Sequence, residues 1–191
     1  MAIRAHKRGI LLVCWWLVLL YALAACGVPA TVEEELVLEV EGAETPEAAA
    51  RGFVQVLNEA LDDPALTSIE QRRVWSERLT SYFAPSERQG LRYPLQLMLA
   101  NFADGQQSLP EGQNLTLEIT YETVEVLPVD ERRVSVRLLD SLLRYRVFQE
   151  TDTGFRRVLV DRQYPLNEVL GMGSDGFPVL QVNGRWFLTE R

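Results

Sequence analysis

Apolar residues along the chain follow three successive patterns. A continuous apolar run occupies residues 10–23, helical spacing extends from about residue 45 to residue 104, and alternation of apolar and polar residues begins near residue 115. Residues three to four apart share one face of a helix, whereas alternate residues share one face of a strand. The order therefore predicts a helical first half, a strand-rich second half and an α+β domain.

The region of helical spacing divides into three predicted helices. Thr45-Pro46-Glu47 supplies an N-cap, a proline at the first helical position and an acid in the first turn, so the first helix begins there and ends at 62–64. Residues 68–71 (SIEQ) resemble a capping box and open the second helix. The core-facing residues expected on these two helices are Ala49, Phe53, Val56, Leu57, Ala60 and Leu61, then Val74, Trp75, Leu79, Tyr82 and Phe83.

The third predicted helix contains two residues that weaken helices. It starts at Pro85-Ser86 and runs to about Ala103, but Gly90 and Pro94 lie inside it. A proline removes one backbone donor and clashes with the preceding turn, so we expect a kink or a short break near Arg92.

Turn residues separate the strand-like runs of the second half. Residues 128–130 (PVD), 152–154 (DTG) and 183–184 (NG) each lie between two such runs, and Asn-Gly is typical of a tight hairpin. Sequential strands should therefore be antiparallel neighbours. We predict N-terminal helices packed on a curved antiparallel sheet of about four or more strands.

The phase of the alternation changes within the long strand predicted at 132–149. Apolar residues occupy even positions before Leu139 and odd positions after it, and 121–124 show a similar change in the preceding strand. Because alternation with period two cannot change phase without an irregularity, we predict a β-bulge at or near Asp140-Ser141.

The N-terminal residues have the three regions of a secretory signal. Residues 1–9 are basic, 10–23 are uncharged and mostly apolar, and small residues follow. A permanent membrane-spanning helix would need about 20 apolar residues, and this run is shorter. Residues Leu23, Ala24, Ala25 and Cys26 resemble the lipobox of bacterial lipoproteins, which implies a diacylglycerol on Cys26 and cleavage before it. A plain cleaved signal with a chance cysteine is the alternative.

These features divide the chain into residues 1–25 (a lipoprotein signal peptide), 26–44 (a lipidated cysteine with an acidic tether) and 45–191 (the α+β domain). The tether holds six glutamates, and its alternating Leu36, Leu38 and Val40 could also form an edge strand. The resemblance places the domain on the extracytoplasmic side of a cell membrane or outer membrane. Gly27 stands where lipoproteins retained at an inner membrane often have aspartate, which favours an outer surface.

The net charge narrows the classes of partner. The chain carries −8 at pH 7, and removing the leader removes three of 19 basic residues and none of 27 acidic ones, leaving about −11. Such a surface repels nucleic acid and anionic headgroups, so attachment to a membrane must come from the lipid on Cys26.

The inventory of reactive side chains excludes several kinds of site. The mature chain has no histidine and no cysteine besides Cys26, so zinc sites, disulfides and histidine-based catalytic triads are not expected. Residues 171–176 (GMGSDG) match a dinucleotide-binding pattern, but a strand rather than a helix follows, so a flexible loop is predicted. Residues 152–154 (DTG) match an aspartic-protease triplet but lie at a turn. We predict no cofactor and no metal.

The order of a helix with TPEAAARGFVQVLNEAL, a stretch with FAPSERQGLRYPLQLMLANF and strands ending in QVNGRWFLTE resembles the nuclear-transport-factor-two-like superfamily, especially its bacterial lipoproteins. The resemblance covers about 45–191. It implies a cone of curved sheet and helices, usually with a cavity, that serves enzymes, small-ligand binding or dimerisation. A catalytic Asp-Tyr pair in that cavity could only involve residues such as Asp140, Tyr121 and Tyr145.

Three functions remain open from the sequence. The leading hypothesis is a non-enzymatic, lipid-anchored module that binds a small ligand or an envelope protein. The alternatives are a dehydratase- or isomerase-like cavity enzyme that uses carboxylate acid-base chemistry, and a structural subunit that forms a homodimer. The candidate cavity-lining residues are Trp75, Tyr82, Tyr121, Asp140 and Tyr145.

Overall fold

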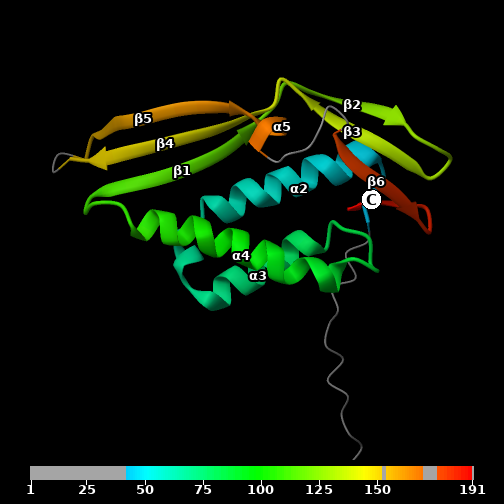
Figure 1. Cartoon of the computed structure of the whole chain (residues 1–191), viewed down its shortest axis with the longest axis horizontal. Coiled ribbons are helices and arrows are strands. Elements are labelled where there is room, and N and C mark those ends of the chain that lie inside the picture. The colour runs from blue at the N-terminus through cyan, green and yellow to red at the C-terminus, as the bar shows by residue number, and fades with distance from the viewer. Residues whose placement is uncertain (1–41, 152–153, 170–175, 191) are drawn as a thin grey trace, which may run out of the picture. The chain divides into compact units, whose positions relative to one another are not determined.

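The α+β class predicted from the sequence is confirmed by the structure, a computed structural model that describes residues 42–151, 154–169 and 176–190. Helices α2, α3 and α4 precede the strands in the chain, and Figure 1 shows α2 next to the strands with α3 and α4 beyond it. The helices are α2 (Pro46–Leu61), the 3₁₀-helix η1 (Pro64–Thr67), α3 (Ile69–Thr80), α4 (Arg88–Gln107) and the short α5 (Leu166–Val169). The strands are β1 (Gln113–Thr120), β2 (Thr123–Pro128), β3 (Arg133–Leu139), β4 (Leu142–Glu150), β5 (Arg156–Pro165), β6 (Phe177–Val182) and β7 (Arg185–Leu188).

The predicted N-caps of α2 and α3 are present. Thr45 Oγ1 accepts a hydrogen bond from the Ala48 amide at 3.1 Å, and Ser68 Oγ accepts one from the Gln71 amide at 3.4 Å. Each bond satisfies a backbone N–H that has no partner within its helix. These local signals therefore fix where the two helices begin.

The apolar stripe predicted for the second helix is wrong at Val74, whose side chain is 51% exposed. The buried face of α3 is formed by Leu79 together with the small polar residues Ser76 and Thr80. The hydroxyls of Ser76 and Thr80 donate to carbonyl oxygens of their own helix, at 2.8 and 2.9 Å. Because these hydroxyls are satisfied within the helix, small polar side chains can be buried without an unpaired donor.

Helix α4 runs without a break across Pro94, contrary to the alternative of a short break. It continues to Gln107, beyond the predicted end near Ala103. Leu91 before the proline and Leu99 and Phe102 after it are all buried. Burial on both sides of Pro94 holds the two parts in one helix despite the missing backbone hydrogen bond.

The strands form two antiparallel sheets rather than one curved sheet. One has the order β1-β4-β5 and the other β2-β3-β6-β7. β1 leads directly into β2 and β3 into β4, so the two sheets are joined by one long hairpin that is interrupted midway (Figure 1). The predicted hairpin turn at Asn183-Gly184 connects β6 and β7, with φ of 51° and 81° at the two residues.

Helix α2 forms the centre of the core. The six residues predicted to face inward from α2 are all buried, and this helix contacts strands of both sheets. Phe53 packs edge-on against Phe83 and Phe177, with ring centroids 5.5 and 6.3 Å apart. The first predicted helix therefore supplies the apolar face that both sheets cover.

The outer edge of β7 is occupied by two other segments. Ala43 exchanges backbone hydrogen bonds with Trp186 at 2.9 and 3.0 Å, and Phe83 forms a parallel bridge to Leu188. The possible edge strand at 36–40 lies outside the described residues.

Candidate functional site

The junction between the two sheets lies where the sequence predicted an irregularity. Thr120 pairs with Leu142 and Thr123 pairs with Leu139, so the ladder is interrupted by two residues on each strand. A β-bulge adds a residue to one strand only. The predicted position is therefore right, but the irregularity is a symmetric break rather than a one-residue bulge.

Asp140 takes the unusual backbone conformation at this break. Its φ is 51°, in the left-handed region that residues other than glycine seldom occupy. On either side of it, the Leu139 carbonyl accepts a hydrogen bond from the Glu122 amide and the Ser141 carbonyl accepts one from the Leu166 amide, both at 3.0 Å. The second bond attaches the end of β5 to the break.

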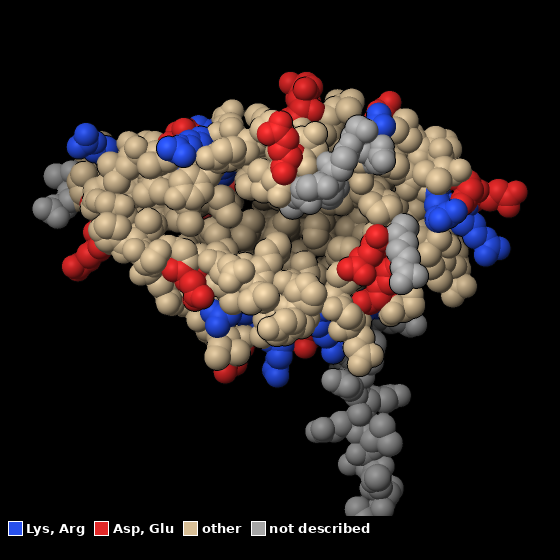
Figure 2. All heavy atoms as spheres, in the orientation of Figure 1, with Lys and Arg blue, Asp and Glu red and all other residues tan. Residues whose placement is uncertain are grey.

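A cavity of about 440 Å³ opens at this junction. We call it the junction cavity, and the residues that line it are Arg137, Leu138, Leu139, Asp140, Ser141, Leu142, Pro165, Leu166, Asn167, Gly176 and Phe177. These residues come from the break, from the start of α5 and from the start of β6. Figure 2 shows that the same face of the molecule is hollowed between the strands and the helices, with few charged side chains in the hollow.

Polar groups occupy one part of this largely apolar lining. Arg137 Nε is buried and has no hydrogen-bond partner among the described residues, while its Nη1 lies 3.9 Å from Glu125 Oε2. The Asp140 side chain is exposed and Ser141 is partly buried. The Nε atom is closed to solvent, but the Arg137 side chain as a whole is 36% exposed and its contact with Glu125 is long, so its outer guanidinium N–H groups can meet a ligand that carries an acceptor.

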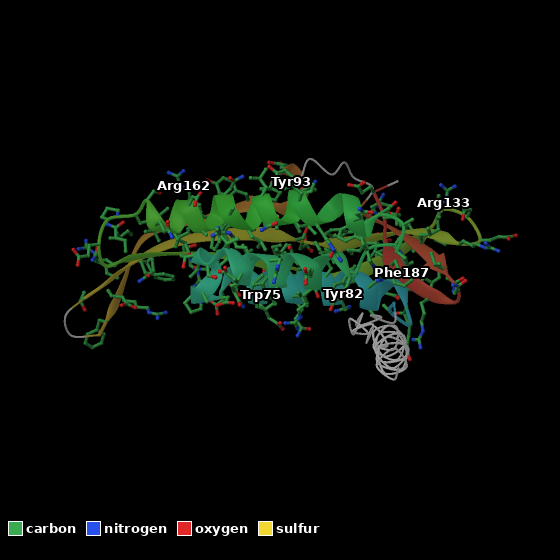
Figure 3. All side chains as sticks on the ribbon, turned by 90° about the horizontal axis from the view of Figure 1, so that it is seen from below. Trp75, Tyr82, Tyr93, Arg133, Arg162 and Phe187 are labelled. Atoms are coloured by element: carbon green, nitrogen blue, oxygen red, sulfur yellow. The ribbon has the colours of Figure 1, made fainter. Side chains whose placement is uncertain are left out.

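Trp75 and Tyr82 do not line the junction cavity. The Trp75 indole Nε1 donates to Asp63 Oδ2 at 2.6 Å and so ties α3 to the turn before η1. Tyr82 packs edge-on against Phe53 and lies against Gly52, where a Cβ would come within 2.6 Å of its ring. Figure 3 shows both residues on the side of the molecule opposite Tyr93 and Arg162, and we assign both to helix packing.

Tyr121 and Tyr145 also lie outside the residues that line this cavity. Tyr121 is at the break, but the guanidinium of Arg51 on α2 lies over its ring, 5.7 Å from the centroid. Tyr145 is on β4, opposite Leu117 and Arg162, and packs against the core. Of the five candidate residues, the structure places Asp140 alone in the wall of the junction cavity.

Sequence reasoning missed the residues that complete this wall. Asn167 lies in α5, between β5 and β6, and Phe177 opens β6, where it pairs with Val136 of β3. This pairing of distant strands follows from the tertiary structure. Gly176 belongs to the glycine-rich loop that the sequence singled out, and its φ is 77°. A Cβ there would come within 2.5 Å of the Val136 carbonyl oxygen, so the glycine marks a close approach of two backbones.

Several expectations concern residues beyond the described part of the chain. The lipidated Cys26 and its neighbours Leu23, Ala24 and Ala25 lie outside it. Within the described ranges, none of the helices has the length and apolarity needed to cross a membrane. The same ranges contain no cluster of three or more histidine, cysteine, aspartate or glutamate side chains that could hold a metal ion.

No protein-family model matches the chain, and no curated protein is significantly similar to it.

Proposed function

We propose that this chain is a lipid-anchored lipoprotein of the cell envelope whose α+β domain binds a small ligand at the junction cavity. The observation that carries the proposal is the cavity of about 440 Å³, which contains the Asp140 singled out from the sequence. Small-ligand sites usually have volumes of about 300–1,000 Å³ and combine an apolar wall with a few polar groups. The lipobox of residues 23–26 supports the anchor.

The lining favours a ligand with an apolar body and one polar end. Leu142, Leu166 and Phe177 supply apolar surface, while the partly exposed guanidinium of Arg137 offers donors. The exposed carboxylate of Asp140 offers an acceptor at the rim. An acceptor on the ligand would satisfy Arg137, and a donor would meet Asp140.

The alternative of a carboxylate enzyme receives no specific support at this cavity. The catalytic pair that the family resemblance implied is an aspartate with a tyrosine. Asp140 lines the junction cavity, but neither Tyr121 nor Tyr145 is among the described residues that line it. We therefore retain ligand binding as the proposed function.

The anchor is tested by Cys26→Ala. We expect the variant to remain an uncleaved, unlipidated precursor, because the lipid is attached to the sulfur atom of Cys26. Intact-mass spectrometry of the two proteins measures this directly. A wild-type protein that is processed but carries no lipid would contradict the anchor.

The cavity is tested with fragment-sized probes that carry an aromatic body and a carboxylate or sulfonate. Amide chemical-shift mapping on ¹⁵N-labelled full-length protein should place bound probes at 137–142 and 166–167. Asp140→Asn should raise the affinity of these anionic probes, because it removes a like charge from the rim, while costing less than about 1 kcal/mol of stability. The matched control is Asp104→Asn, an exposed aspartate on α4 outside the cavity. Unchanged affinity in Asp140→Asn would show that Asp140 is not part of the site. If no probe shifts any of these amides, the proposed ligand site at the junction cavity is refuted.

A further inference from the structure

We propose that a second cavity, at the start of β1, binds a neutral saccharide. Its volume is about 400 Å³, and none of its lining residues is shared with the junction cavity. It lies where the end of α2, the last turn of α4 and the start of β1 meet the end of β4. We call it the amide cavity, for the side chains of Gln106, Gln113 and Asn114 in its wall.

An unsatisfied hydroxyl marks the wall of the amide cavity. Thr116 Oγ1 is buried and has no hydrogen-bond partner among the described residues. Thr116 lies directly opposite Arg146 on β4, but the guanidinium of Arg146 is directed to Glu118 Oε2, at 3.0 Å. The hydroxyl is closed to solvent in this structure, so a ligand or water in the cavity would satisfy it only after the Thr116 side chain turns toward the cavity.

The amides of the wall provide donors and acceptors side by side without charge. Gln106 Nε2 donates to the Leu115 carbonyl at 3.1 Å, which fixes this side chain and leaves its Oε1 as an acceptor. Gln113 and Asn114 each add a carbonyl oxygen and an NH₂ group. A sugar hydroxyl is both donor and acceptor, so neighbouring hydroxyls of one ring match this set of amides.

The charges around the amide cavity disfavour an anionic ligand. Arg156 Nε lies 3.5 Å from Glu150 Oε1, so this arginine already has an acidic partner. Asp62, at the end of α2, adds a further negative charge to the wall. These protein carboxylates would repel a ligand that carries a phosphate or carboxylate group. They can accept hydrogen bonds from the hydroxyls of a neutral sugar.

Apolar side chains complete the match to a sugar. Leu61, Pro64 and Phe148 also line the cavity. One guanidinium, that of Arg146, lies 5.4 Å from the centroid of the Phe148 ring. Sugar rings present C–H groups between their hydroxyls, and these groups pack against apolar surface. A neutral saccharide therefore fits both the polar and the apolar parts of the wall.

The test is a titration of the full-length, ¹⁵N-labelled protein in a polyoxyethylene detergent, which contains no sugar. The probes are cellotriose, maltotriose and chitotriose, with glucose 6-phosphate as the anionic comparison. We expect at least one trisaccharide to shift the side-chain NH₂ resonances of Gln106, Gln113 and Asn114. Glucose 6-phosphate should shift them less at the same concentration.

Thr116→Val tests the role of the unsatisfied hydroxyl. The substitution keeps the shape of the side chain, and loss of one neutral hydrogen bond should weaken saccharide binding about three- to tenfold. Thr120→Val is the matched control, because Thr120 is exposed at the end of the same strand and lies outside the cavity. Circular dichroism should show that both variants stay folded.

Two results would overturn the proposal. One is that none of the three trisaccharides shifts the amide resonances. The other is that Thr116→Val and Thr120→Val bind the active trisaccharide equally well. Because the two cavities share no lining residue, neither result bears on the ligand binding proposed for the junction cavity.

Discussion

Single side chains hold the loops of this domain in place. Asp63 is the clearest case, because its carboxylate accepts three hydrogen bonds: from the Ala65 amide at 2.8 Å, from Gln71 Nε2 at 2.7 Å and from Trp75 Nε1 at 2.6 Å. Burial alone would raise the pKa of Asp63, but these three hydrogen bonds, led by that of Trp75, lower it below its ordinary value. Trp75, a candidate for a cavity wall, is instead part of a structural cluster.

Removing the Asp63 carboxylate should therefore change stability and its dependence on pH. Asp63→Ala should cost about 1–3 kcal/mol, since three donors lose their acceptor. A lowered pKa stabilises the folded state above the unfolded value of about 3.9, and this contribution is lost as the pH falls through the folded pKa. Asp63→Asn should remove that part of the acid sensitivity. Urea unfolding at neutral pH and near pH 3 measures how much the free energy of unfolding falls between the two pH values. An equal fall in the wild type and in Asp63→Asn would contradict the lowered pKa of Asp63.

Gly176 has a positive φ and also lies close to another backbone segment. Gly184 has a positive φ without such a contact, so comparing the two separates the cost of the backbone conformation from the cost of the contact. Both have φ near 80°, but a Cβ at Gly184 would meet open space, whereas one at Gly176 would meet Val136. Gly184→Ala should cost about 1–2 kcal/mol for the backbone conformation. Gly176→Ala should cost about 1–3 kcal/mol more, because β6 must shift away from β3. Chemical denaturation of the two variants compares these costs, and equal losses would show that the contact is readily relieved.

Among the elements, the two edges of the three-stranded sheet differ in how they are covered. On β1, the side-chain amide of Asn58 bonds both backbone groups of Ile119, at 2.9 Å each, and Gln106 bonds the Leu115 carbonyl. These amides imitate a neighbouring strand and so protect an edge that could pair with another chain. The edge strand β5 instead carries arginines at 156, 157 and 162, and its pairing with β4 is irregular at Val147/Phe148.

Asn58 should therefore contribute more to the stability of the folded domain than an exposed asparagine does. Asn58→Leu leaves the Ile119 N–H and C=O without partners at a partly buried edge, which should cost about 1–3 kcal/mol. The Ile119 amide should also exchange with solvent faster. Asn101→Leu, on the exposed side of α4, is the control and should change stability by less than about 0.5 kcal/mol. Similar losses in the two variants would show that the amide contributes little to the edge.

At the scale of the whole molecule, the described domain is organised around α2 and closed near residue 43. The two backbone hydrogen bonds between Ala43 and Trp186 and the ion pair of Glu44 with Arg185, at 3.5 Å, attach the segment before α2 to β7. Gly42 lies against Phe187, where a Cβ would come within 2.2 Å of the ring. The segment that the sequence assigned to a tether thus contributes to the fold at 42–44.

The boundary of the folded unit can be measured with two fragments. We expect residues 45–191 to fold alone without metal or reductant, since the core residues of α2 and of both sheets lie within that span. Residues 42–191 should be more stable by about 1–3 kcal/mol, the contribution of two backbone hydrogen bonds and their local packing. Urea unfolding of both fragments tests this. A fragment 45–191 without sharp amide resonances would contradict independent folding, and equal stabilities would contradict the role of Ala43.

The sequence by itself determined the features that arise from neighbouring residues. Thr45 and Ser68 cap their helices because a side-chain oxygen reaches an amide three residues ahead, and Asn183-Gly184 forms a tight turn because both residues tolerate a positive φ. The change of phase near Asp140 located the break, since alternation with period two records which face of a sheet is buried. All of these depend on contacts within a few residues.

The tertiary structure alone decided which distant segments meet. Val74 is exposed because Ser76 and Thr80 form the buried face of α3, which helical spacing could not show. β6 pairs with β3 and β5 pairs with β4, so the strands divide into two sheets and both cavities arise between segments that are far apart in the chain. The same alternation of apolar residues is compatible with many strand orders, because pairing energies along the backbone differ little between partners. Packing against α2 selects one of these strand orders. That strand order in turn places Asp140 in the wall of the junction cavity.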